Sequence, residues 1–542
     1  MEEPKAWAAS SMASGDRSTR DGGRVTEARM GQSSRTSRAG AGWDCEPGGF
    51  KDLLRPGHTS LSWVRPALLF RARNDWLART LGDPTNSERR RWVAGQLARH
   101  ADSDFTVRQY ADRPDVSFLV LADTGEGDAS QYCLVPGLLQ MADGTSFMFI
   151  NGDVVYPSGD AADYEDRFYR PYKDYPGPIY AVPGNHDWYD GLNGFMRHLC
   201  DAKASDKAQH VEKAGALWQR ALRRFMWRNP SRTSEREIED MRTIRPHPEQ
   251  QAAQPGSYFA IDTGPLLLVA IDTGVLGDID RDQGEWLRRI SGAVGKPKIL
   301  LTGKPLYAEG VRYPGRIEDS NMTVDDIVRA PENDYIAAIG GDIHHYERYP
   351  VSLENGRIVQ YIVNGGGGGG MQGTHKIPRI DLPGIQESDW RCYPLRGDSL
   401  SRVSEIYQRR LGWLLGKLAI PPDQAATLMA EHLDISPVRP LDSDGVVSHE
   451  SRRAFKKIFS SRVRLPGPVR EYLAQFLDWN DPPMFKSFLR IDASPQEIRI
   501  QCFAATGCRK HEEDPPLEDA VKALRSPDGS WMWRTPEAGK LI

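Results

Sequence analysis

The chain has 542 residues, of which 39% are hydrophobic and 27% are charged, the composition of an ordinary globular protein. Lys and Arg number 70 against 74 Asp and Glu, and the resulting net charge of −4 argues against long nucleic acid as a partner. No segment approaches the ~20 apolar residues that cross a bilayer, so no membrane partner is expected.

The N-terminal part of the sequence predicts disorder followed by helices. Residues 1–42 contain no Leu, Ile, Phe or Tyr and cannot bury enough apolar surface to fold, so we expect a disordered segment over 1–55. Apolar residues at helical spacing follow in 63–81 and 88–101. They predict a helical lead-in over 56–110.

Short apolar runs that end in polar turns fill residues 111–375 and predict the core of an α/β fold. Examples are SFLVLAD, SFMFINGD, PIYAVPGNHD, KILLTGKP and YIAAIGGDIHH. Continuously apolar strands are typical of sheets that are covered on both faces. Because polar groups at the ends of such strands converge on one edge, we expect a ligand site there.

Other segments are expected to decorate this core. Helical insertions are predicted at 188–255 and 376–478, returning strands of the core at 479–510, and a C-terminal tail at 511–542. The six cysteines form no CxxC pair, which in so long a chain is typical of reduced thiols and favours a cytoplasmic location.

Polar residues at the strand ends form an ordered set of motifs. They are Asp123 in LADTG, Asp153 and Tyr156 in NGDVVYPSG, Asn185 and His186 in GNHD, Gly303 in TGKPLY, and Asp342 and His344 in GGDIHHYER. Singly each is a weak signal, since an Asp after a strand usually caps a turn. As an ordered set they resemble the calcineurin-like metallophosphoesterases, closest to the purple acid phosphatase-like branch, over roughly 115–375 and 485–507.

The resemblance implies a four-layer α/β/β/α sandwich with helical insertions, and a metal-dependent phosphoester hydrolase of the phosphatase type. In it a metal-bound hydroxide attacks a phosphomonoester in line, while two cations neutralise the phosphoryl oxygens. The implied metal ligands are Asp123, Tyr156 and His344 at a first site, Asn185 and Asp342 at a second site, and Asp153 as the bridge between the two. The candidate catalytic residues are His186, Asp187 and His345, and the candidate substrate-binding residues are Lys304 and Arg348.

The motifs leave the identity and the number of the bound metal ions open. A phenol at Tyr156 favours ferric iron if it ligates; if it only packs over the site edge, Mn²⁺, Zn²⁺ or Fe²⁺ is favoured. The usual second-site histidines are replaced by Gly303 and Asp342, so one or two ions of Fe, Mn or Zn are expected, with a second site that is weak, differently loaded or empty. The double substitution Gly303→His with Asp342→His is expected to rebuild the usual set.

Several alternatives stay open on the sequence. Lys304 either supplies a positive charge near phosphate or is a solvated surface lysine. His345 and Arg348 either contact substrate or pack structurally, and residues 188–190 either border the substrate or anchor the following insertion. The expected partner is a small phosphorylated substrate. The alternative functions are a phosphodiesterase that acts on a small nucleotide-type diester, and a degenerate binder of a phosphorylated ligand without turnover.

Overall fold

The computed structural model of the protein describes residues 45–534, except 58–65, 100–103, 209–221, 223–224, 229, 253, 294, 439–440, 442–445 and 460–480. Within these residues, the strands form an eight-stranded sheet, a seven-stranded sheet and a short hairpin. Residues 1–44 of the segment predicted as disordered, and residues 209–221 and 460–480 of the two predicted helical insertions, lie outside the described residues.

The eight-stranded sheet comprises β1 (Thr106–Val107), β5 (Phe259–Asp262), β6 (Leu267–Ile271), β7 (Lys298–Thr302), β10 (Tyr335–Gly340), β11 (Tyr346–Ser352), β12 (Ile358–Asn364) and β13 (Arg391–Tyr393). Its order is β1-β5-β6-β7-β10-β12-β11-β13. Strands β6, β7, β10 and β12 run parallel to their neighbours in this group, so their carboxyl ends meet at one edge.

The seven-stranded sheet comprises β2 (Val116–Leu121), β3 (Phe147–Asn151), β4 (Ile179–Val182), β14 (Lys486–Ala493), β15 (Glu497–Ala505), β16 (Leu517–Arg525) and β17 (Trp531–Arg534). Its order is β17-β16-β15-β14-β2-β3-β4. Strands β2, β3 and β4 are parallel, and β14 joins β2 in the antiparallel sense. The hairpin pairs β8 (Tyr307–Ala308) with β9 (Val311–Arg312).

Helices surround these sheets. The α-helices are α1 (Pro66–Arg71), α2 (Asn74–Leu81), α3 (Thr85–Arg99), α4 (Ala129–Tyr132), α5 (Val135–Gln140), α6 (Asn193–Leu199), α8 (Glu235–Arg242), α9 (Arg281–Ala293), α10 (Val324–Arg329), α11 (Arg396–Leu415), α12 (Pro422–Leu433), α13 (His449–Phe459) and α15 (Arg509–Glu513). Single turns of other helix types are η1 (Phe50–Leu53), η2 (Ala161–Asp163), η3 (Glu165–Tyr169), η4 (Asp187–Asp190), η5 (Ala204–Asp206), η6 (Pro248–Gln250), η7 (Pro331–Asn333) and η8 (Thr374–Lys376).

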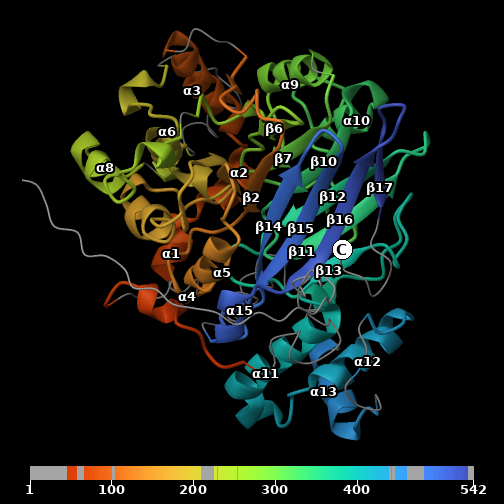
Figure 1. Ribbon diagram of the computed structural model, residues 1–542. Helices are drawn as coiled ribbons and strands as arrows, with labels where there is room; N and C mark the ends of the chain where they lie inside the picture. Colours follow the sequence, from red (N-terminus) through yellow and green to blue (C-terminus); the bar gives the residue numbers. More distant parts are fainter. Residues whose placement is uncertain are drawn as a thin grey trace, which may run out of the picture.

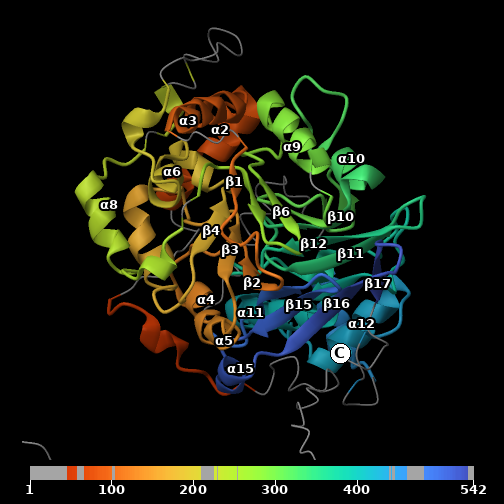
Figure 2. The same ribbon diagram turned by 45° about the horizontal axis from the view of Figure 1, so that its top comes forward.

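The two large sheets pack face to face, with helices on their outer faces (Figures 1 and 2). Phe149 of β3 stacks on Phe259 of β5 between the sheets, with ring centroids 6.0 Å apart. Residues of α9 and α10 join the same apolar core, whereas the outward face of β2 and β3 packs against α5 and α6. This confirms the predicted four-layer α/β/β/α sandwich, which follows from strands that are apolar on both faces.

The predicted helical segments are present where the structure describes them. The lead-in forms α1, α2 and α3, the insertion at 188–255 contains α6 and α8, and the insertion at 376–478 contains α11, α12 and α13. Figure 1 shows α11, α12 and α13 together below the sheets. The returning strands at 479–510 are β14 and β15, which extend the seven-stranded sheet beside β2.

Both ends of the described chain are more ordered than we predicted. The segment predicted as disordered includes η1, whose Phe50 is fully buried against Tyr132 and Met484. The predicted tail contains β16 and β17, which complete the seven-stranded sheet. These two boundaries are therefore wrong for residues 45–55 and 511–534: Phe50 is buried against residues far away in the sequence, and β16 and β17 pair in succession with β15.

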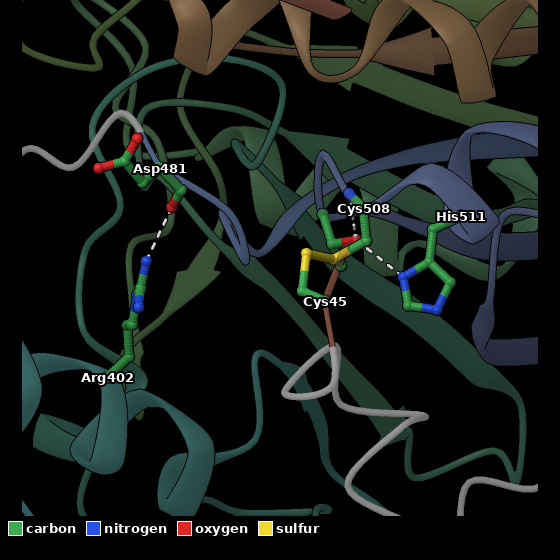
Figure 3. Close-up of a disulfide and its surroundings, with 6 residues drawn as sticks. Cys45, Arg402, Asp481, Cys508 and His511 are labelled. Carbon is green, nitrogen blue, oxygen red and sulfur yellow. Dashed lines mark hydrogen bonds between the residues drawn. A yellow bond between two sulfur atoms is a disulfide. The ribbon is translucent and has the colours of Figure 1, made fainter. Parts of the chain in front are cut away.

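A disulfide joins Cys45 to Cys508 and corrects the prediction that all cysteines are reduced (Figure 3). The other four cysteines are buried and lie outside this disulfide. Because disulfides are rare in the reducing cytoplasm, the predicted cytoplasmic location loses its basis. Among the described residues, none of the helices combines the length and the apolar character needed to span a membrane.

Candidate metal centre

The predicted ligands converge because parallel strands of both sheets end at the same edge. Asp123 follows β2, Asp153 follows β3 and Asp342 follows β10. All three adopt left-handed backbone, with φ of +55°, +48° and +72°. This conformation is uncommon for residues other than glycine, is tolerated best by Asp and Asn, and is concentrated at functional sites.

A phenol oxygen lies at the centre of the first cluster. The Tyr156 Oη is 3.0 Å from Asp153 Oδ2, 3.1 Å from His344 Nε2 and 3.3 Å from Asp123 Oδ1. Asp123, Asp153 and Tyr156 are almost fully buried, and His344 is partly exposed. The structure thus brings together the four side chains that the resemblance assigns to the first metal site.

The electrostatics of this cluster favour a bound cation. Burial, and after it the charges of Asp153 and Asp342, raise the pKa of Asp123 well above its usual range. Burial, and after it the charges of Asp153 and Asp123, also raise the pKa of Tyr156 well above that of a free phenol. Anionic oxygens held this close to one another are costly unless a positive charge lies between them.

His344 is held in the form that a metal ligand needs. Its Nδ1–H donates to the Gly370 carbonyl oxygen at 2.7 Å, which leaves Nε2 as the unprotonated nitrogen toward Tyr156 and Asp123. Burial lowers the pKa of His344 to about 4, so its imidazole is neutral near pH 7. A backbone carbonyl on the second ring nitrogen is the usual support of a metal-binding histidine.

The glycine run at 365–370 packs directly against this cluster. A Cβ on Gly365 would lie 2.1 Å from the Ile343 carbonyl oxygen and 2.7 Å from Asp123 Oδ2. A Cβ on Gly369 would lie 2.6 Å from His344 Cε1. Glycine is therefore required here because the backbone passes too close for any side chain.

His186 and Asp187 follow β4 and have different surroundings. The His186 backbone N–H donates to Asp153 Oδ1 at 2.8 Å, and its Nδ1–H donates to the Pro157 carbonyl oxygen at 2.8 Å. Its imidazole is partly exposed beside the Tyr156 ring, with centroids 4.4 Å apart. Asp187 is fully buried and accepts the backbone N–H groups of Val154, Val155 and Gly184.

Asp187 therefore shapes the GNHD turn, and its fully buried carboxylate has a structural role in place of the catalytic role that we predicted. Burial, followed by the charge of Asp153, raises the pKa of Asp187 to about 8. The neighbouring residues 188–190 also anchor the chain. Trp188 Nε1 donates to Asp272 Oδ1 at 2.9 Å, and Asp190 accepts the backbone N–H groups of Asn193 and Gly194 at the start of α6.

His345 and Arg348, predicted to touch substrate, lie in buried networks away from the cluster. His345 Nε2 is 2.8 Å from Glu347 Oε1, and its Nδ1 is 3.2 Å from the Gln372 carbonyl oxygen. Arg348 donates to both carboxylate oxygens of Asp519 on β16, at 2.5 and 3.2 Å. Both side chains are at most 1% exposed. Of the two alternatives for these residues, structural packing therefore fits the structure and contact with substrate does not.

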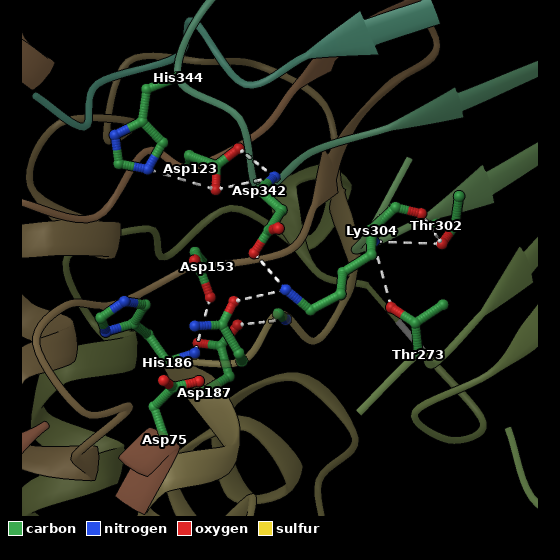
Figure 4. A network of polar contacts seen from close by, with 12 residues as sticks. Asp75, Asp123, Asp153, His186, Asp187, Thr273, Thr302, Lys304, Asp342 and His344 are labelled. Carbon is green, nitrogen blue, oxygen red and sulfur yellow. Dashed lines mark hydrogen bonds and ion pairs between the residues drawn. The ribbon is translucent and has the colours of Figure 1, made fainter. Parts of the chain in front are cut away.

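At the second predicted metal site, the ammonium group of Lys304 lies beside the predicted ligands Asp342 and Asn185. Lys304, after β7, donates from Nζ to Asp342 Oδ1, and the same Nζ is 3.5 Å from Asn185 Oδ1 (Figure 4). A Cβ on Gly303 would lie 2.6 Å from the Pro183 carbonyl oxygen. The expected rebuilding of this site by Gly303→His with Asp342→His is thus blocked by backbone.

Sequence reasoning missed the residues that hold the two sheets in register beside the site. Asn151 at the end of β3 donates from Nδ2 to the Ile339 carbonyl oxygen of β10 at 3.1 Å. Asn364 at the end of β12 donates to the Val120 carbonyl oxygen of β2 at 3.0 Å. Both are strand-final asparagines next to a glycine, which is the signal that could have identified them.

The lead-in helices also contribute to the site, which the sequence did not indicate. Leu68 of α1 and Ala72, which follows that helix, pack against Tyr156. Asn74 of α2 donates to the Tyr189 carbonyl oxygen at 2.7 Å, and the Tyr189 hydroxyl accepts the Asn185 amide at 2.9 Å. These helices therefore support both Tyr156 and the turn that follows β4.

The donor set of the first site fits a hard or borderline cation. Two carboxylates, a phenol and an unprotonated imidazole nitrogen suit iron, manganese or zinc, with the phenol favouring ferric iron. Counting His, Cys, Asp and Glu alone, the described residues contain no group of three or more with metal-binding geometry. The phenol of Tyr156 is what draws this set together, as its contacts to all three partners show.

Comparison with known proteins agrees with this geometry. Residues 116–346 match the calcineurin-like phosphoesterase family, which confirms the resemblance predicted from the motifs and the fold class for this segment. The match covers less than half of the chain and includes all of the first-site residues. No curated protein matches the chain.

Solved structures with a similar chain path include three that share little sequence. The purple acid phosphatase PPD1 from yellow lupin (Lupinus luteus) seeds is 12% identical, with 77% of this chain and 55% of that chain covered and a TM-score of 0.38. PhoD is 11% identical (79% and 72% covered, TM-score 0.35), and GAP50, the anchor in the inner membrane complex of Plasmodium, is 13% identical (48% and 75% covered, TM-score 0.31). This chain spans about half the length of the lupin protein.

Proposed function

We propose that the chain, whose residues 116–346 match the calcineurin-like phosphoesterase family, is a metal-dependent phosphoester hydrolase of the phosphatase type. The observation that carries the proposal is the convergence of Asp123, Asp153 and His344 on the Tyr156 hydroxyl at the strand ends. A cation held there would polarise a phosphoryl oxygen and lower the pKa of a coordinated water. The proposed ion is iron, manganese or zinc.

The residues that line the accessible side of the cluster would handle the substrate. Asn185, His186, Lys304 and Asp342 are partly exposed, in contrast to the buried Asp123 and Asp153. His186 holds its Nδ1 proton on the Pro157 carbonyl, so Nε2 is the atom that can exchange a proton. We assign to it protonation of the leaving oxygen.

A small phosphomonoester is the proposed substrate class. A monoester dianion carries more negative charge than a diester and gains more from an ammonium group beside the cation. Lys304 supplies such a group on the exposed side of the cluster. A phosphodiester would gain less from the Lys304 ammonium, since it has a single negative charge to neutralise.

Hydrolysis of generic aryl esters tests the proposal. The full chain, loaded separately with Fe, Mn²⁺ or Zn²⁺, is assayed with p-nitrophenyl phosphate and bis(p-nitrophenyl) phosphate. We expect faster turnover of the monoester and a loss of roughly 100-fold or more in Asp153→Asn, which removes a central ligand charge. Asp143 lies in an exposed turn, and Asp143→Asn is the matched control, which is expected to keep wild-type turnover.

The same assay separates the alternatives. Preferred turnover of the diester would favour the phosphodiesterase. A chain that binds metal and inorganic phosphate but hydrolyses neither ester would be a non-catalytic binder of a phosphorylated ligand. Wild-type turnover in Asp153→Asn would contradict the proposed centre altogether.

A further inference from the structure

The backbone of Lys304 is held in place by hydrogen bonds in the turn that follows β7. The Lys304 backbone N–H lies 3.1 Å from Thr273 Oγ1 and 3.2 Å from Thr302 Oγ1, and the Thr302 hydroxyl donates to the Lys304 carbonyl oxygen at 2.9 Å. These contacts fix the turn after β7 (Figure 4). The aliphatic part of Lys304 therefore leaves a fixed backbone and points into the cluster.

Its ammonium group lies between residues that the resemblance assigns to a second metal. Nζ donates to Asp342 Oδ1 and lies 3.5 Å from Asn185 Oδ1. Asp342 is in turn tied to the first cluster, because its backbone N–H donates to both carboxylate oxygens of Asp123, at 2.9 and 3.1 Å. Figure 4 shows Lys304 reaching across to Asp342, beside Asp153.

The residues of this place do not fit a second metal ion. The position where a histidine ligand is expected is Gly303, and a Cβ there would lie 2.6 Å from the Pro183 carbonyl oxygen and 3.2 Å from Thr273 Oγ1. The bridging Asp153 already accepts the His186 backbone N–H on Oδ1 and lies 3.0 Å from the Tyr156 hydroxyl with Oδ2. The other two second-site oxygens, from Asn185 and Asp342, both face the same ammonium group. A divalent ion would have to displace a cation that already neutralises Asp342.

We infer that Lys304 takes the place of the second metal ion, so that the centre holds one metal ion per chain and a lysine ammonium as its second cation. The inference rests on the proposed metal-dependent function. It implies that the positive charge facing the substrate phosphate is partly built into the chain. It also implies that removal of the ammonium exposes Asp342 and Asn185, an oxygen pair that suits a hard ion such as Mn²⁺.

Metal stoichiometry tests this inference. The full chain is saturated with Mn²⁺ and desalted, metal per chain is measured by mass spectrometry, and the Mn²⁺ resonance is recorded for signs of a coupled pair. We expect one ion per wild-type chain with a mononuclear resonance, and a second, weaker ion in Lys304→Ala. Lys304→Arg keeps the charge and is expected to hold one ion.

The chain offers a matched control. Lys296 pairs with Asp262 at 2.5 Å and is partly buried like Lys304, but it lies at the opposite end of β7. Lys296→Ala is expected to hold one ion per chain. A second ion in this control as well would show that any lost lysine raises the metal count and would overturn the inference.

The remaining outcomes are also decisive. Two tightly bound, coupled ions in the wild-type chain would overturn the inference and leave the proposed function intact, and this measurement needs no variant to fold. A folded Lys304→Ala that titrates with Mn²⁺ like the wild type would overturn it too. A wild-type chain that holds no metal under any loading would overturn the proposed function, and the inference with it.

Discussion

His344 and His345 are neighbours in the chain with opposite surroundings. The imidazole of His344 faces Tyr156 and Asp123, with Nε2 3.8 Å from Asp123 Oδ1. The imidazole of His345 is fully buried against Glu347, which also accepts the backbone N–H of Glu309 at 3.0 Å. One residue of the turn therefore reaches the cluster, and the next ties the turn to the eight-stranded sheet.

Substitution of each histidine separates the two roles. We expect His344→Asn to lose bound metal and to melt like the metal-free wild type, since a ligand at the site rim is removed and only the stabilisation by the bound ion is lost. We expect His345→Asn to keep its metal but to unfold more easily, by about 1–3 kcal/mol, because the Glu347 carboxylate loses a buried partner. Metal per folded chain and thermal unfolding check both. Metal loss in His345→Asn without a change in stability would contradict the assignment.

The motifs predicted which residue types gather at the site but not where every side chain points. Asp123, Asp153 and His344 follow strand ends, and strand order brings those ends together. Arg348 comes from the same GDIHHYER motif, yet its partner Asp519 lies 171 residues further along the chain. The direction of a side chain after a turn depends on such distant partners, which no local pattern contains.

The helix α6 carries a buried imidazole in an aromatic setting. His198 stacks on Tyr164, with ring centroids 4.1 Å apart and an interplanar angle of 12°. Its Nε2 donates to the Ala161 carbonyl oxygen at 3.0 Å, and its Nδ1 accepts the Tyr169 hydroxyl at 3.1 Å. Both ring nitrogens are thus satisfied by a neutral imidazole, and burial lowers the pKa of His198 to about 3.

This environment predicts a loss of stability in acid. The unfolded chain binds a proton on His198 below its ordinary pKa of about 6.5, whereas the folded chain resists protonation. The full contribution is present above pH 6.5 and is lost as the pH falls toward 3, by at most about 1.4 kcal/mol per pH unit. Denaturant unfolding at pH 7 and pH 5 should show a smaller decrease for His198→Gln than for the wild type. Equal decreases would contradict the prediction.

Strands were easier to predict than the ends of the sheet. The strands β3, β6 and β7 are fully buried and come from nearly continuous apolar runs. The strand β16 has the sequence LEDAVKALR, whose charged residues are not typical of a buried strand. Its Asp519 is nevertheless buried, because Arg348 neutralises it. Because this ion pair joins residues of the two sheets, the pattern of apolar residues alone does not predict the strand.

At the scale of the whole molecule, two segments far apart in the sequence form one unit. Besides the disulfide between Cys45 and Cys508, the Gly48 backbone N–H donates to the Gly507 carbonyl oxygen at 2.8 Å. The Glu512 carboxylate of α15 accepts the backbone N–H groups of Gly49 and Phe50 at 2.9 and 3.0 Å. Cysteine spacing alone could not predict a pair separated by 463 residues.

Loss of the disulfide should affect stability far more than the metal centre. A link that closes so long a loop restricts the unfolded chain, and such links typically contribute about 2–4 kcal/mol. We expect Cys45→Ser to melt several degrees below the wild type while its metal content stays unchanged, and a reductant to lower the melting temperature of the wild type but not of the variant. Thiol titration of the unfolded, unreduced wild type should detect the four cysteines outside the disulfide. Detection of all six would show that Cys45 and Cys508 are unpaired, and the buried Phe50 and the Glu512 contacts would then have to hold the N-terminal segment in place by themselves.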